Sequence, residues 1–89
     1  MKQKTYVRVA GKEVALISED DPAYLRRVAA YVDRKLNETA AAMRMSVPSA
    51  TVLTAIALGD ELMRAQDENQ RLRRELLALR EQAAQKKEP

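Results

Sequence analysis

The chain of 89 residues contains no cysteine and no histidine. Disulfides, thiolate metal sites and cysteine nucleophiles are therefore excluded, and the commonest general base and metal ligand is missing. Only two glycines occur, and they do not form a phosphate-binding loop. No nucleophile–base pair or metal cluster can be assembled from what remains. We expect a protein that is not an enzyme and that uses no metal or cofactor.

Aromatic residues are scarce as well, with no Phe, no Trp and three Tyr. Any core must be aliphatic, and a chain this short commonly gains stability by associating with other chains. Apolar residues make up 46% and charged residues 33%, which is too apolar for a disordered chain and too charged for a membrane protein. No apolar run approaches the ~20 residues of a membrane span, and no signal core follows the first residues. We expect a cytoplasmic protein without a membrane partner.

The net charge of +3 is unevenly distributed. Residues 1–50 contain nine basic and six acidic residues, whereas residues from 51 onward contain seven of each. The whole positive excess therefore lies in the first half. This excess suits contact with an acidic protein surface as well as it suits contact with phosphate.

The first half of the chain predicts a β-hairpin followed by a helix. Residues 5–9 and 14–17 have the composition of strands, and Gly11 between them permits a tight turn. Asp20 or Asp21 is placed to cap a helix that begins at Pro22 and runs to about residue 43. Apolar residues at spacings of three and four form one stripe on this helix, which we expect to face a core: Leu25, Val28, Ala29, Val32, Leu36, Ala40 and Met43.

The second half of the chain predicts one long helix. Pro48 interrupts the first helical pattern, Ser46 can cap the second helix, and residues 48–85 contain no further proline. Such a helix would be ~55 Å long, which a small head cannot bury. The predicted fold class is α+β, with a hairpin-plus-helix head that dimerises over residues 1–46, a coiled-coil helix over residues 47–85 and a frayed tail over residues 86–89.

A heptad repeat runs through the long helix and predicts a parallel coiled coil. Its a and d positions form the predicted seam: Ala55, Leu58, Leu62, Ala65, Asn69, Leu72, Leu76, Leu79 and Ala83. A central Asn at an a position lowers stability but fixes register and strand number, because two such side chains pair across a parallel dimer. The alternative is that Asn69 lies on a loosely packed face.

Residues beside the seam indicate whether the chains run parallel and how many helices associate. In a parallel pair, Glu68 would face Arg73 of the other chain and Glu75 would face Arg80, whereas antiparallel chains would bring like charges together. A second apolar line at the b positions widens the stripe: Ile56, Met63, Leu77 and Ala84. We interpret it as the contact between two parallel dimers packed antiparallel into a tetramer. The alternative is that Ile56 and Met63 cover the head.

Three segments resemble the ZapA family of bacterial cell-division proteins. They are the hairpin Val7-Arg8-Val9-Ala10-Gly11-Lys12-Glu13, the helix segment from Asp20 to Leu36 with its Tyr-Leu and Val-Ala-Ala-Tyr-Val-Asp motifs, and Ala55-Ile56-Ala57-Leu58-Gly59-Asp60-Glu61-Leu62. Gly59 stands where the family usually has Asn. The match in order and spacing covers nearly the whole chain.

The resemblance implies a partner, the tubulin-like division GTPase FtsZ, whose filaments the family bundles and aligns at the division septum. Because FtsZ is acidic, we expect the head's cations to contact it, first Lys12 and Arg44, then Arg26, Arg27, Arg34 and Lys35. For each of these the alternative is a solvated charge. A competing function is nucleic-acid binding through the Arg71, Arg73 and Arg74 cluster and the Lys86–Lys87 pair, which the neutral balance of the second half and the scarcity of aromatics disfavour.

Overall fold

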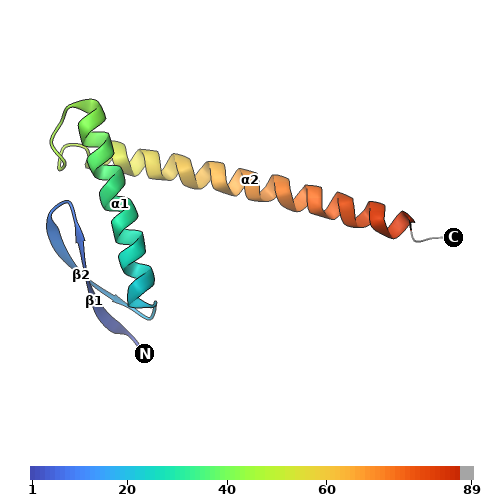
Figure 1. Cartoon of the computed structure of the whole chain (residues 1–89), viewed down its shortest axis with the longest axis horizontal. Helices are drawn as coiled ribbons and strands as arrows, with labels where there is room; N and C mark the ends of the chain where they lie inside the picture. The colour runs from blue at the N-terminus through green and yellow to red at the C-terminus, as the bar shows by residue number, and fades with distance from the viewer. Residues whose placement is uncertain (87–89) are drawn as a thin grey trace. The chain divides into compact units, whose positions relative to one another are not determined.

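The computed structural model describes residues 1–86. It contains two strands followed by two helices: β1 (Gln3–Val9), β2 (Lys12–Ser18), α1 (Pro22–Met43) and α2 (Thr51–Lys86) (Figure 1). The chain divides into two compact units, a head unit (Met1–Ala55) and a second unit that begins at Ile56. The predicted order of hairpin, helix and long C-terminal helix is confirmed. Of the predicted frayed tail, Lys86 is the last residue of α2, and residues 87–89 lie outside the described residues.

The hairpin is an antiparallel pair in which Val9 lies opposite Lys12 and Gln3 lies opposite Ser18. Only Ala10 and Gly11 form the turn, and both have positive φ, of 56° and 72°. Two residues with positive φ make a type I′ turn, whose twist matches that of the strands. The strands are therefore longer than predicted, and Lys12 and Glu13, expected in the turn, belong to β2.

Helix α1 begins as the sequence indicates. The Asp21 carboxylate accepts a hydrogen bond from the Ala23 N–H at 3.0 Å, and Pro22 occupies the first turn, where its missing N–H costs nothing. The other candidate cap, Asp20, instead pairs with the Ser18 hydroxyl at 3.0 Å. The helix ends at Arg44, whose left-handed conformation lets its N–H reach the carbonyls of Ala40 and Ala41.

The core of the head lies between α1 and β1. Thr5 and Val7 of β1 are buried, as are three members of the predicted stripe, namely Ala29, Leu36 and Ala40. Two other members are exposed, Val28 at 43% and Met43 at 56%, so the expectation that the whole stripe faces a core was wrong for them. Among the described residues, α1 packs on β1 and not on β2, and one strand is too narrow to cover the full stripe.

Helix α2 starts at Thr51, four residues after the predicted start of the coiled-coil helix at residue 47. Residues 47–50 form a turn instead, in which the Ser46 hydroxyl accepts a hydrogen bond from the Ser49 N–H at 3.3 Å. Ala50 and Thr54 are buried in the head unit, and the Thr54 hydroxyl donates to the Ala50 carbonyl at 2.8 Å. The first turn of α2 is thus part of the head unit.

Candidate interaction surfaces

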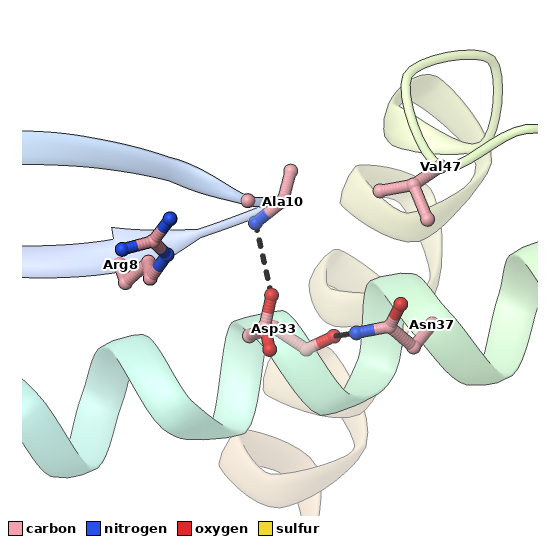
Figure 2. Close-up of a pocket in the computed structure, with 6 residues that line it drawn as sticks. Arg8, Ala10, Asp33, Asn37 and Val47 are labelled. Carbon is pink, nitrogen blue, oxygen red and sulfur yellow. Dashed lines mark hydrogen bonds between the residues drawn. The ribbon is translucent and has the colours of Figure 1, made fainter.

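The hairpin turn is held by a carboxylate from α1. The Ala10 N–H donates a hydrogen bond to the Asp33 carboxylate at 2.9 Å, over a separation of 23 residues (Figure 2). Alanine at positive φ is strained because its Cβ approaches the carbonyl oxygen, so this conformation needs support from elsewhere. A charge-assisted hydrogen bond supplies that support. Asp33 thereby fixes the position of the turn relative to α1.

A hollow of about 430 Å³ lies beside this contact (Figure 2). On α1, Asn37 lies one turn after Asp33 and donates its side-chain N–H to the Asp33 backbone carbonyl at 2.8 Å. The hollow is lined by the turn, by α1 and by the segment that comes after α1: Arg8, Ala10, Gly11, Asp33, Asn37 and Val47. Three segments that are distant in the sequence therefore border one concave surface.

We expect Asp33→Ala to destabilise the head by about 2 kcal/mol, because the Ala10 N–H loses a charged acceptor while the strained turn remains. Urea unfolding at one fixed protomer concentration measures this change, since stability depends on concentration when chains associate. Asp33→Asn is the matched control, because its amide oxygen can still accept the bond. Equal stabilities of Asp33→Ala and the unchanged chain would show that the bond does not hold the turn.

The two cations predicted as the main contacts, Lys12 and Arg44, flank the segments that border the hollow. Lys12 is the first residue of β2 and is exposed. Arg44 is the exposed C-cap of α1, three residues before Val47. The structure therefore brings the turn that precedes Lys12 and the segment that follows Arg44 to one concave surface, although neither cation is among the residues that line it.

The four weaker candidates do not form one basic patch. The guanidinium carbons of Arg27 and Arg34 lie over the rings of Tyr24 and Tyr31, at 5.5 Å and 5.2 Å from the ring centroids. Arg34 also lies 3.7 Å from the Glu38 carboxylate. The other two candidates have different surroundings. Arg26 lines a groove between α1 and β1, and Lys35 is half-buried.

The structure also exposes an aromatic face on α1 that was not predicted from the sequence. Tyr24, Val28 and Tyr31 are each between 40% and 48% exposed, and with Arg27 they line one shallow apolar surface. Their spacing of four and three places them on a single helix face. That spacing was the signal available in the sequence, but Val28 was assigned to the core stripe instead.

The predicted seam of α2 is open to solvent in the single chain. Leu72, Leu76 and Leu79 are between 48% and 56% exposed. Isolated exposed leucines are ordinary, whereas a periodic row of them along a helix marks an interaction surface. The other predicted seam and b-position residues are also exposed or half-buried: Ala55, Ile56, Leu58, Leu62, Met63, Ala65, Asn69, Leu77, Ala83 and Ala84.

Charged residues beside the seam pair within the helix. The Arg71 guanidinium binds the carboxylates of Glu68 and Glu75, one turn before and one turn after it. The hydrogen bond from Arg71 lowers the pKa of the Glu68 carboxyl. The Glu68–Arg71 pair therefore persists below the pH at which an ordinary glutamate is protonated, and it is lost as the pH falls through that lowered pKa. The Asn69 amide oxygen accepts a hydrogen bond from Arg73 at 3.1 Å.

Within residues 1–86, no group of three or more acidic side chains is placed to hold a metal ion. Neither of the two described helices is sufficiently long and apolar to cross a membrane. What the described chain offers is a set of surfaces: a concave surface of the head, an aromatic face and an exposed leucine row. Such surfaces bind other macromolecules.

The architecture defines a class of small α+β proteins in which a hairpin-and-helix head precedes a long helix with an exposed heptad seam. The sequence profile of the family described as "Cell division protein ZapA" matches residues 6–88. The chain belongs to the ZapA family of cell division proteins.

Individual relatives agree with this assignment. The chain is 36% identical over 76 residues to "Cell division protein ZapA" of Geobacillus kaustophilus (strain HTA426), covering 84% of each chain. It is 33% identical over 72 residues to the protein of the same description from Geobacillus thermodenitrificans (strain NG80-2), covering 80% and 79%. A solved structure described as "ZapA mutant dimer from Geobacillus stearothermophilus" matches with a TM-score of 0.66 and 36% identity, over 85% of this chain and 90% of that one.

Proposed function

We propose that this protein acts without catalysis, as an oligomer that binds and cross-links FtsZ filaments at the division septum. The observation that carries the proposal is the exposed leucine row on α2, in a chain of the ZapA family. An exposed row of this length has no stable place on a solitary chain, and self-association would bury it. The similar structure from Geobacillus stearothermophilus is described as a dimer.

The proposed assembly is a parallel two-stranded coiled coil along the a and d positions, with Asn69 at its centre. Two such dimers pack antiparallel through the b-position line, which places head pairs at opposite ends of a tetramer. A cross-linker needs at least two binding surfaces held apart, and this arrangement provides them. Bivalent binding to a polymer also raises apparent affinity without new contacts.

The proposed filament contact is the concave end of the head flanked by Lys12 and Arg44. Both are exposed, and they flank segments that line the same hollow. Arg26, Arg27, Arg34 and Lys35 contribute at the rim of the interface, where charged pairs chiefly speed association. The engagement of Arg27 and Arg34 with tyrosine rings supports a secondary role for them.

Co-sedimentation with FtsZ polymerised by GTP tests the proposal. We expect the full chain to pellet with the polymer and to thicken filaments into bundles seen by electron microscopy, with no pelleting when GTP is omitted. Titration with duplex and single-stranded nucleic acid tests the competing function. A steeply salt-dependent complex with nucleic acid, together with no binding to FtsZ polymer, would contradict the proposed function.

The nucleic-acid alternative receives little support from the described side chains. Arg71 is engaged by two carboxylates of its own helix, and Arg73 is bonded to Asn69. Lys87 lies outside the described residues.

A further inference from the structure

The outer edge of β1 carries backbone groups without partners. In an antiparallel pair joined by a two-residue turn, Val9 and Lys12 face each other as a hydrogen-bonded pair, and the backbone groups of alternate residues point away from the partner strand. On β1 the residues that point outward are Lys4, Tyr6 and Arg8. None of the hydrogen bonds found among residues 1–86 reaches their outward N–H and C=O groups. A row of such groups is a template for another strand.

Helix α1 converts this edge into a groove. Within the described chain α1 packs on β1 alone, so the edge of β2 has no such wall. A hollow of about 260 Å³ lies between the helix and the strand. Its lining combines three aliphatic residues with polar and aromatic side chains: Val7, Ala29, Ala30, Tyr6, Arg8, Arg26 and Asp33. The small side chains of Ala29 and Ala30 leave room for an approaching backbone.

The charges around the groove select an acidic occupant. Lys4 and Arg8 lie on the edge strand and Arg26 lies on the helix wall, whereas β1 contains no acidic residue. Asp33 is the acidic residue of the groove lining, and its carboxylate already accepts the bond from the Ala10 N–H. Pairing β1 with β1 of a second copy about Tyr6 would set Lys4 opposite Arg8, and directly opposed like charges destabilise a sheet. An acidic strand of another protein meets no such repulsion.

We propose that the free edge of β1 binds an extended acidic peptide segment, which adds a third strand to the sheet beside α1. Main-chain hydrogen bonds to Lys4, Tyr6 and Arg8 supply affinity, and side-chain pairing supplies specificity. The positions of the ligand opposite Lys4 and Arg8 are acidic. The ligand residues opposite Thr5 and Val7 lie on the same face of the sheet as those two side chains, the face that α1 covers. These ligand residues are therefore small and apolar. This site overlaps the FtsZ contact proposed above at Arg26, and also at Arg8 and Asp33, which line both hollows.

The probe is the blocked peptide acetyl-Glu-Val-Thr-Val-Glu-amide, which presents the same side-chain pattern in either strand direction. Added to the ¹⁵N-labelled full chain, it is expected to shift the backbone amide resonances of residues 4–8 and of Ala29 and Ala30. The same peptide with Lys in place of both Glu residues is expected to bind at least 10-fold more weakly. Because no FtsZ is present, the outcome is independent of whether the chain binds filaments.

Tyr6→Pro is the decisive variant. It removes the outward N–H of residue 6, while the hydrogen bonds between the strands join odd-numbered residues of β1 to even-numbered residues of β2 and are retained. We expect it to abolish the shifts, whereas Tyr6→Ala, which keeps the N–H, changes affinity less than 3-fold. If Tyr6→Pro does not fold, Arg8→Glu, expected to weaken binding at least 10-fold, replaces it. Equal binding of the Glu and Lys peptides, shifts confined to the Tyr24–Tyr31 face, or no shifts at 5 mM peptide would each overturn the proposal.

Discussion

The double substitution Leu72→Glu with Leu76→Glu is expected to convert the protein into monomers. Both leucines occupy the predicted seam, and both are about half exposed in the single chain. In a coiled coil these positions face the partner chain, so the substitution would bury two carboxylates per chain in an apolar interface. Losing one such leucine typically costs 2–5 kcal/mol, and about 4 kcal/mol corresponds to roughly 1,000-fold weaker association.

Sedimentation equilibrium over a range of concentrations measures the effect. The unchanged protein is expected to show tetramers that dissociate to dimers on dilution, and dimers alone up to high micromolar concentration would contradict the proposed tetramer. Ala78→Glu with Gln85→Glu is the matched control, because it introduces the same two charges at exposed c positions outside the seam. If the double variant retained the mass of the unchanged protein, α2 would not associate through these leucines.

The fold was largely predictable because its elements carry strong local signals. Asp21 and Pro22 start α1 as expected, and the long stretch without proline became α2. The errors occurred where tertiary packing decides. The sequence showed one apolar stripe on α1, but it could not show that the helix would cover β1 alone and leave Val28 and Met43 exposed.

The concave surface of the head was only partly predictable, because it also depends on tertiary packing. Lys12 and Arg44 were chosen on charge and on their position at the ends of elements. The contact between Asp33 and Ala10 spans 23 residues and depends on how the hairpin docks on α1, which no local pattern encodes. The positive φ of Ala10 was unexpected as well, because alanine is a poor residue for that conformation.

The heptad repeat of α2 can be read from the sequence, but the contacts that its charged side chains make within the helix cannot. Within the helix, Glu68 and Glu75 bind Arg71, whereas the heptad register assigned them to Arg73 and Arg80 of a partner chain. An exposed ion pair contributes little to stability, typically below ~1 kcal/mol, whether it forms within one helix or between two chains. The choice between these pairs therefore affects the relative direction of the chains more than the stability of the assembly. Leu72, Leu76 and Leu79 of the predicted seam, by contrast, are about half exposed in the single chain. Association through α2 would therefore rest on apolar burial, with the charges selecting parallel over antiparallel chains.

Reversing two charges in the head, Lys12→Glu with Arg44→Glu, is expected to abolish co-sedimentation with FtsZ polymer while leaving the oligomer intact. Each substitution replaces an attraction to an acidic surface by a repulsion, and like charges opposed across an interface cost several kcal/mol. Two such changes correspond to binding weaker by roughly 100-fold or more. Lys12 and Arg44 are exposed and have no role in the core, so the head should remain folded.

Net charge alone could produce the same loss, so the control must carry an identical change. Arg64→Glu with Arg74→Glu reverses two exposed cations of α2 outside the a and d positions and is expected to pellet as the unchanged protein does. A second variant, Lys12→Glu with Arg44→Asn, separates loss of charge from backbone strain at residue 44. Asn removes the positive charge and tolerates the left-handed backbone conformation of this C-cap. Full pelleting of the Lys12→Glu/Arg44→Glu variant, with sedimentation showing an unaltered oligomer, would remove the concave end of the head as the filament contact. The same loss in both double variants would show that long-range charge, and not a local interface at Lys12 and Arg44, holds the protein to the polymer.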